Sequence, residues 1–164
     1  MKTLYIGGIK SGKSKNAERY ILKNATTKPI YLATNEFFDE EMRERVKLHK
    51  ERRAEHFVTL EEPLYIADAI AQSQSAVLVE CVSMWVNNML YHQKSKDAII
   101  QEIEKTLQLS QDIVYVINDV SCSIVSEHKL TRQFVDINGI VAQILASHCE
   151  NVYMSVAGIE VKIK

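Results

Sequence analysis

The sequence predicts an α/β fold in which helices flank a mostly parallel β-sheet. The first observation is that short apolar runs alternate along the chain with segments of helical spacing. The second is that the clearest of these runs, Ala76 to Val79, shows no polar alternation, which is typical of a strand covered on both faces. The third is a glycine-rich segment between a strand and a helix. With 164 residues and no linker or repeat, we expect one domain over residues 1–164.

The strands are predicted from the apolar runs. Leu4-Tyr5-Ile6 comes first, and the Ile, Tyr and Leu of the run 29–34 suit a second, buried strand. A short strand is expected over 57–60. Three more are expected over 76–80, 113–117 and 152–156, and residues 159–164 follow the turn Ala157-Gly158 as a hairpin partner.

The helices are predicted from apolar side chains that recur at intervals of three and four. The segment 15–23 follows the glycines directly. The segment 39–53 has acidic side chains at its start and basic ones near its end, which the helix dipole favours. The remaining helices are expected over 65–71, 84–91, 96–109 and 131–149.

The composition excludes several classes of protein. A net charge of -1 gives no support for a nucleic-acid-binding surface. No apolar run approaches the roughly 20 residues that span a bilayer. The three cysteines, Cys81, Cys122 and Cys149, form no C-x-x-C pair, so neither a disulfide framework nor a zinc site is indicated. Without a secretory signal after Met1, we expect a cytoplasmic protein.

The glycine-rich segment has the spacing G-x-x-x-x-G-K-S of a phosphate-binding loop. Glycines let the backbone curl so that its N–H groups point at phosphate oxygens, and the N-terminus of the next helix adds to the same site. Lys13 would reach the outer phosphates and the Ser14 hydroxyl would ligate Mg²⁺. The alternative is a glycine-rich turn without a ligand. The residues of the loop are Gly7, Gly8, Ile9, Lys10, Ser11, Gly12, Lys13 and Ser14.

Polar residues follow other predicted strands. In parallel sheets, ligands bind beyond the carboxyl ends of the strands. Here those ends carry Thr34-Asn35-Glu36, Glu80 and Asn118-Asp119. An acidic residue such as Glu80 holds the Mg²⁺ shell, or a water beside the phosphates, in phosphate-loop enzymes. The other interpretation of Glu80 is a solvated carboxylate at a strand end.

His49 has an unusual setting on the predicted helix 39–53. Arg45, Arg52 and Arg53 lie three or four residues away, near the same face. Cationic neighbours disfavour the imidazolium, and a neutral imidazole is a nucleophile. From spacing alone, a surface histidine on a basic helix remains the preferred interpretation. The other histidines are expected to be structural or solvated: His56, His92, His128 and His148.

Several blocks together make the chain recognisable. Besides the phosphate-binding loop, they are Tyr31 to Thr34, Asp39-x-Glu41-Met42-x-x-Arg45-x-x-x-His49-Lys50, Leu78 to Cys81, Asn87 to Leu90, Asn118 to Val120, Ile124-Val125 and the ending Val156-Ala157-Gly158-Ile159-x-Val161 to Lys164. From Tyr5 to Lys164 the chain resembles the bifunctional adenosylcobinamide kinase / adenosylcobinamide-phosphate guanylyltransferase family of cobalamin biosynthesis. The histidine block and the ending are more specific than the loop, which many families share.

The resemblance implies a RecA-like P-loop NTPase fold, homotrimers and two reactions. The first phosphorylates adenosylcobinamide with ATP or GTP, and the second transfers GMP from GTP to the resulting phosphate, giving adenosyl-GDP-cobinamide. The second reaction passes through a guanylylated histidine, which matches His49 and reverses the preference stated above. The resemblance also implies that the GTP site is lined by residues 7–14, Thr34, Asn35, Glu36, Lys50, Glu51, Arg52, Arg53, Glu61 and Glu80.

The chain departs from the family pattern in its second half. Two glycines and a proline of the family are absent from residues 118–126, and an arginine and an asparagine are replaced by Ile140 and Ala142. These changes bear on the corrinoid contacts and the kinase step rather than on the GTP site. Two alternatives therefore stay open: a phosphate-loop kinase of another small alcohol, and a GTP-binding protein without turnover.

Overall fold

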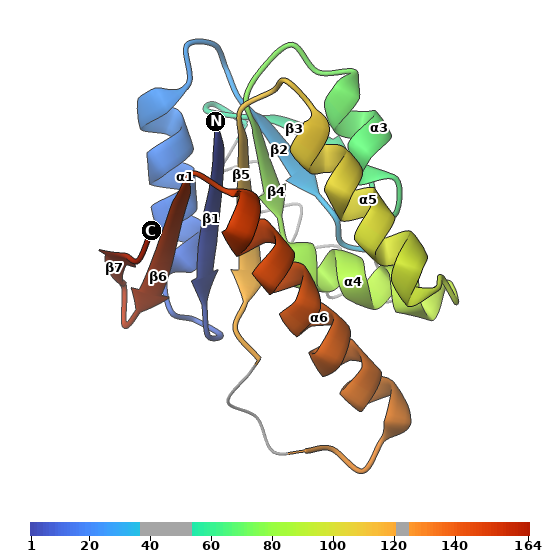
Figure 1. Cartoon of the computed structure of the whole chain (residues 1–164). Helices are drawn as coiled ribbons and strands as arrows, with labels where there is room; N and C mark the ends of the chain where they lie inside the picture. Colours follow the sequence, from blue (N-terminus) through green and yellow to red (C-terminus); the bar gives the residue numbers. More distant parts are fainter. Residues whose placement is uncertain (37–53, 121–124) are drawn as a thin grey trace.

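The computed structural model of the chain describes residues 1–36, 54–120 and 125–164 (Figure 1). The predicted helix over 39–53 lies outside these residues, as do His49 and residues 50–53. Part of the altered loop, 121–124, lies outside them as well. The fold described below is that of the remaining chain.

The described strands form one seven-stranded sheet with the order β3-β2-β4-β5-β1-β6-β7. Neighbouring strands are parallel except for the β6–β7 hairpin, which is antiparallel. The prediction of a mostly parallel sheet is therefore confirmed. The strands are β1 (Lys2–Gly7), β2 (Ile30–Ala33), β3 (Val58–Glu61), β4 (Val77–Glu80), β5 (Ile113–Asn118), β6 (Asn151–Val156) and β7 (Ile159–Lys162).

Helices cover both faces of this sheet. Helix α1 packs on one face against β1, β4, β5 and β6, whereas α4 and α6 contact the opposite face and α5 packs on α3 and α6 (Figure 1). The described helices are α1 (Lys13–Asn24), α3 (Ile66–Ala71), α4 (Val82–Tyr91), α5 (Lys96–Gln108) and α6 (Lys129–His148). Each overlaps a helix predicted from apolar spacing.

The two faces of the central strands carry separate apolar clusters. In β1, Leu4 belongs to the cluster packed with α3, α4, α5 and α6, and its neighbour Tyr5 belongs to the cluster under α1. Successive strand residues point to opposite faces, so a strand buried on both sides must be apolar throughout. This burial explains why the strands showed no polar alternation in the sequence.

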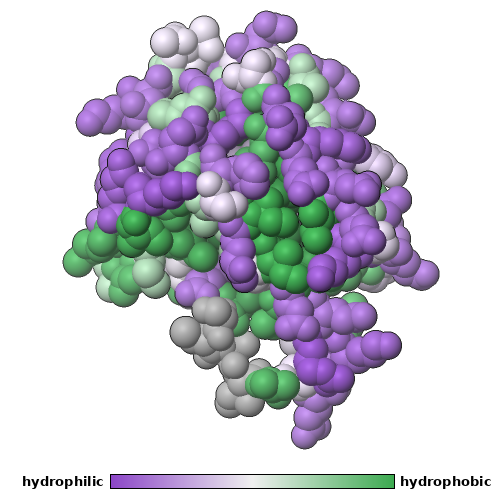
Figure 2. Space-filling model, viewed as in Figure 1, coloured by the Kyte–Doolittle hydropathy of each residue, from purple (hydrophilic) through white to green (hydrophobic). Residues whose placement is uncertain are grey.

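Strand β1 lies inside the sheet, between β5 and β6. Gly7, its last residue, pairs with Asn118 of β5 and with Ser155 of β6. The chain then continues into the loop before α1 at the carboxyl edge of the sheet. The β6–β7 hairpin closes the sheet beside β1, and Figure 2 shows apolar side chains gathered over this hairpin, where Val156, Ile159, Val161 and Ile163 are exposed.

Candidate functional site

The loop between β1 and α1 follows a tight backbone path that requires glycine at position 12. Gly12 has a φ of 92°, and a Cβ atom there would lie 2.9 Å from the Cα of Gly158. The Gly158 N–H in turn donates a 2.8 Å hydrogen bond to the carbonyl of Ser11. The turn of the β6–β7 hairpin therefore supports the loop from outside, and a side chain at position 12 would displace that support.

The first turn of α1 is free of groups that would compete with an anion. No side chain caps this helix, and its first turn contains no acidic residue. Its leading N–H groups and its dipole therefore favour a bound anion. The Lys13 ammonium donates a 3.2 Å hydrogen bond to the carbonyl of Gly8, which places its charge across the loop. Lys13 is only 7% exposed, so the charge lies inside the site and not in solvent. The loop thus offers both amides and a cation to a phosphate.

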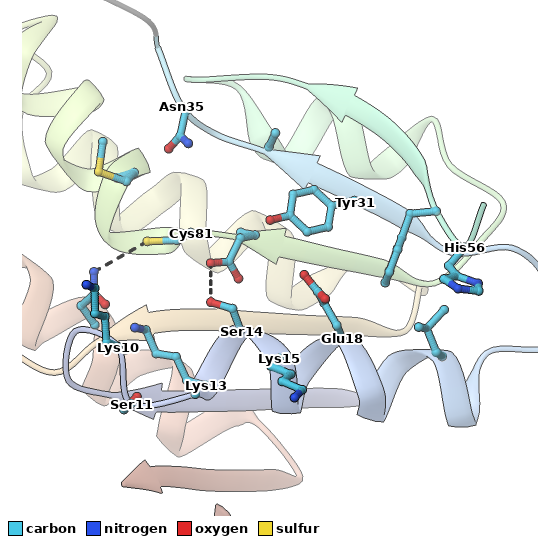
Figure 3. A pocket seen from close by; sticks show the side chains of 17 residues that line it. Lys10, Ser11, Lys13, Ser14, Lys15, Glu18, Tyr31, Asn35, His56 and Cys81 are labelled. Carbon is cyan, nitrogen blue, oxygen red and sulfur yellow. Dashed lines mark hydrogen bonds between the residues drawn. The ribbon is translucent and has the colours of Figure 1, made fainter. Parts of the chain in front are cut away.

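Ser14 and Glu80 meet across the site. The Ser14 hydroxyl of α1 donates a 2.8 Å hydrogen bond to Oε1 of Glu80 at the end of β4, as Figure 3 shows for Ser14. A hydroxyl and a carboxylate are hard oxygen donors, which suit Mg²⁺ that keeps several waters and binds phosphates as well. Within the described residues no group of three or more His, Cys, Asp or Glu side chains could hold a metal by itself. The donor set fits a metal that arrives with a nucleotide.

A cavity of about 890 Å³ extends from the loop across the α1 face of the sheet. Lys10 and Lys13 lie at one end, His56 lies at the other, and Tyr31 and Glu18 lie between them (Figure 3). Lys10, Ser11, Gly12, Lys13, Ser14, Asn35 and Glu80, all predicted site residues, line this cavity. The structure therefore brings the loop, one end of β2 and the end of β4 together, as the resemblance implied.

Thr34 is placed differently from its neighbours. Its side chain is fully buried, and its hydroxyl lies 2.9 Å from the carbonyl and 3.1 Å from the N–H of Cys81. The Asn88 carboxamide donates a 2.5 Å hydrogen bond to the Thr34 carbonyl. The side chain of Thr34 therefore joins the ends of β2 and β4 beneath the cavity.

Glu36 pairs with a histidine for which the sequence indicated no role. Nε2 of His92, just after α4, lies 2.9 Å and 3.0 Å from the two carboxylate oxygens of Glu36. Positions 36 and 92 are far apart in the sequence, so no local spacing could have revealed this pair. Glu61 lines a second cavity, of about 530 Å³, beside Glu62 and Asp68 rather than the cavity at the loop.

Sequence reasoning missed several residues that line the main cavity. Tyr31 and Phe57 were predicted only as strand residues, yet they form an edge-to-face ring pair at 5.7 Å in its wall. Cys81 also lines it; burial, together with the neighbouring charge of Glu80, raises the pKa of its thiol to about 11. This cysteine is therefore a neutral thiol at physiological pH, not a thiolate nucleophile.

The site combines a phosphate-binding loop between β1 and α1, an uncapped helix N-terminus, and the Glu80 carboxylate on β4, two strands from β1. This combination defines a nucleotide-binding protein of the P-loop NTPase class. Solved structures agree on the fold. The flagellar accessory protein FlaH from Methanocaldococcus jannaschii superposes with a TM-score of 0.54 at 11% identity, covering 99% of this chain and 77% of FlaH. The RadB recombinase superposes with a TM-score of 0.51 at 16% identity, covering 93% of this chain and 73% of RadB. The fold is RecA-like.

The chain belongs to the CobU family, described as cobinamide kinase / cobinamide phosphate guanyltransferase, whose model matches residues 3–163. The bifunctional adenosylcobalamin biosynthesis protein CobU of Escherichia coli is 35% identical, and each chain is covered completely. The bifunctional adenosylcobalamin biosynthesis protein CobP of Pseudomonas aeruginosa is 32% identical over all of this chain and 98% of its own. The predicted family is confirmed, and with it the assignment as a cobinamide kinase and cobinamide phosphate guanylyltransferase of cobalamin biosynthesis. Within the described residues no helix is long and apolar enough to cross a membrane.

Proposed function

We propose that this enzyme phosphorylates adenosylcobinamide with ATP or GTP and then transfers GMP from GTP to the new phosphate through a GMP–His49 intermediate. The observation that carries the proposal is the meeting of Ser14 and Glu80, 2.8 Å apart, beside the amides of the loop. That arrangement suits a magnesium-bound nucleoside triphosphate, the reactant that both transfers share.

In the kinase step, the substrate hydroxyl oxygen bonds to the terminal phosphorus of the triphosphate. The bond from that phosphorus to the bridging oxygen breaks, a nucleoside diphosphate leaves and the hydroxyl proton is released. Phosphoryl transfer needs mainly positioning and charge neutralisation. The loop amides and Lys13 hold the phosphates. Ser14 and Glu80 would hold Mg²⁺, which when bound supplies further neutralisation of the phosphate charge.

In the guanylyl step, a ring nitrogen of His49 bonds to the α-phosphorus of GTP, and pyrophosphate leaves as the bond to the bridging oxygen breaks. A phosphate oxygen of adenosylcobinamide phosphate then attacks the same phosphorus. The P–N bond breaks, which regenerates the imidazole and yields adenosyl-GDP-cobinamide. Such a phosphoramidate intermediate divides one difficult displacement into two easier ones.

Further residues of the GTP site are proposed from the resemblance, some touching the nucleotide and others positioning the residues that do. They involve Gly7, Gly8, Ile9, Thr34, Asn35, Glu36, Lys50, Glu51, Arg52, Arg53 and Glu61. Asn35 lines the main cavity, which supports its inclusion. For Thr34 and Glu36, the contacts to Cys81 and His92 suggest that each acts by fixing the end of β2.

The test is covalent labelling. Protein incubated with Mg²⁺ and GTP carrying ³²P at the α-phosphate should take up label through an acid-labile, base-stable bond, whereas GTP labelled at the γ-phosphate should leave none on the protein. His49→Ala should abolish the label. His148→Ala, whose ring contacts the Ile144 carbonyl at the end of α6, is the matched control and should label normally. Adenosylcobinamide phosphate should discharge the label.

Equal labelling of the His49→Ala protein would overturn the histidine intermediate. Phosphate transfer to another alcohol without any GMP–protein bond would favour a different kinase. Tight GTP binding with no product from adenosylcobinamide phosphate would favour a binding protein without turnover.

We also propose a cytoplasmic homotrimer. The exposed apolar side chains of the β6–β7 hairpin support subunit contact, because contiguous exposed apolar surface marks interaction sites. Light scattering after size exclusion should give three times the chain mass of 18.7 kDa. A monomer at micromolar concentration would contradict the trimer.

A further inference from the structure

The ending of the chain is more specific to the family than the phosphate-binding loop, yet none of residues 156–164 lines the main cavity. Its turn lies behind the loop instead, where the Gly158 N–H donates to the Ser11 carbonyl at 2.8 Å. The peptide that follows this carbonyl is trans, so the Gly12 N–H points away from the carbonyl oxygen. The hairpin therefore turns that N–H toward the other side of the loop, where the cavity lies.

Asn16 of α1 joins the hairpin to the loop. It is 3% exposed, and its Nδ2 donates a 3.2 Å hydrogen bond to the buried Ser155 hydroxyl of β6 and a longer one, of 3.5 Å, to the Gly158 carbonyl. Its backbone N–H donates to the Gly12 carbonyl at 3.0 Å. One residue thus holds the hairpin turn through its side chain and the last glycine of the loop through its backbone.

A second set of contacts orients the Asn16 carboxamide, which has one accepting and one donating end. The Arg19 guanidinium has only donors, and its Nη2 donates to the Asn16 Oδ1 at 3.1 Å. The same Nη2 lies 3.2 Å from Oε1 of Glu160 on β7, and the Tyr5 hydroxyl donates to Oε2 of that carboxylate at 3.1 Å. The donating end of Asn16 is therefore directed at the hairpin, which Figure 1 shows beside α1.

We propose that Asn16 is a positioning residue for phosphate binding, which keeps the Gly12 N–H aimed at the nucleotide by holding the hairpin turn against the loop. Asn16 does not line the cavity, so it acts without touching the ligand. A loop that is no longer held must be ordered by the ligand, and this ordering reduces the affinity. The inference rests on the proposed function, because it requires that the loop bind a triphosphate.

The experiment replaces the carboxamide by an apolar side chain of similar size, in Asn16→Leu. The ligand is guanosine 5′-(α,β-methylene)triphosphate with Mg²⁺, in which the α–β bond that His49 would attack cannot break. Its Kd, measured by isothermal titration, should rise about tenfold. In the ligand-free variant the Gly158 amide should exchange with deuterium faster than in the wild type, relative to the amides of β5.

Thr106→Val is the matched control, because it also removes a buried polar contact. The Thr106 hydroxyl lies 2.9 Å from the Tyr115 hydroxyl, between α5 and β5, and the residue is fully buried. This variant should lose a comparable free energy of unfolding, whereas its Kd and the relative exchange of the Gly158 amide should match those of the wild type. A residue that served only the fold would behave like Thr106.

Ser155→Ala provides a second, milder variant, because it removes only the nearer acceptor of the Asn16 carboxamide. Its Kd should rise less than that of Asn16→Leu. The double variant should bind no more weakly than Asn16→Leu alone, since both changes remove the same contact. Should Asn16→Leu fail to fold, unchanged affinity in Ser155→Ala would overturn the inference.

Undiminished affinity in a folded Asn16→Leu protein, or an equal loss in Thr106→Val, would also overturn the inference, while GMP labelling of the wild-type protein would leave the proposed function intact. A wild-type protein that does not bind the triphosphate would overturn both.

Discussion

The Ser14 hydroxyl and the Glu80 carboxylate form a 2.8 Å hydrogen bond that joins the first turn of α1 to the end of β4. Residues 66 positions apart in sequence thereby meet at one point of the sheet edge. Each would exchange this contact for a metal and its water shell when a triphosphate enters, because both offer hard oxygen donors.

Removal of the Ser14 hydroxyl should uncouple nucleotide binding from the metal. In Ser14→Ala, the gain in GTP affinity on adding Mg²⁺ should shrink about tenfold, because one of the metal's protein donors is lost. Isothermal titration with and without EDTA measures this gain. Ser14→Thr keeps the hydroxyl and should retain the gain. A Ser14→Ala protein with the full Mg²⁺ effect would place the metal elsewhere.

An alanine at Gly12 should damage both stability and binding. The φ of 92° is unfavourable for a residue with a Cβ, and that atom would press on Gly158 at 2.9 Å. We expect a loss of about 1–2 kcal/mol in the free energy of unfolding, measured with urea, and weaker GTP binding. Gly139→Ala is the control: it lies within α6 with open space around a new Cβ, so it should stabilise by up to about 1 kcal/mol. Equal effects of the two changes would contradict this account.

Thr34 offers a test of structure against ligand contact. Thr34→Val keeps the shape but leaves the buried Cys81 N–H without the Thr34 hydroxyl as its acceptor, so the free energy of unfolding should fall by about 1–3 kcal/mol. Thr34→Ser should restore most of it. We expect GTP affinity to be unchanged at temperatures where the variant is folded. A large rise in Kd without destabilisation would show that the hydroxyl binds the nucleotide directly.

The buried cysteines should make the free energy of unfolding depend on pH in the alkaline range. Burial raises the pKa of Cys81 to about 11 and that of Cys149 to about 12, from the ordinary thiol value of 9.0. The thiols of the unfolded chain ionise at lower pH than the buried ones. The contribution of the buried thiols to the free energy of unfolding is therefore complete below pH 9 and is lost as the pH rises toward 11 and 12. In a Cys122→Ser background, Ellman's reagent at pH 8 should react with neither thiol until urea unfolds the chain. Fast reaction in the folded protein would contradict the burial of both.

Much of this fold could be predicted from local patterns. The run before Glu80 and the run before Asn118 are apolar because each strand is covered on both faces, and such burial is legible in a single sequence. The loop was legible for a similar reason, since its glycines and Lys13 act through backbone geometry and charge within eight neighbouring positions.

The sequence did not indicate which strand ends would meet or where their side chains would point. Whether the Thr34 hydroxyl faces a ligand or Cys81 depends on β2 lying beside β4, which no local spacing encodes. Glu61, on the edge strand β3, lines a different cavity for the same reason. The pairing of Glu36 with His92 depends on the helix that follows β4. His49 itself lies outside the described residues, so its role stays a prediction.

The contact of Gly158 with Ser11 has a consequence for synthesis of the protein on the ribosome. Strand β1 emerges first, yet both of its partners in the sheet come from beyond residue 112, and the turn that supports the loop comes later still. A growing chain therefore carries its phosphate motif unsupported through most of translation. We expect it to gain affinity for a nucleotide only when the β6–β7 hairpin, residues 151–162, has left the exit tunnel, so that chains stalled or cut short before this hairpin would be unable to capture GTP.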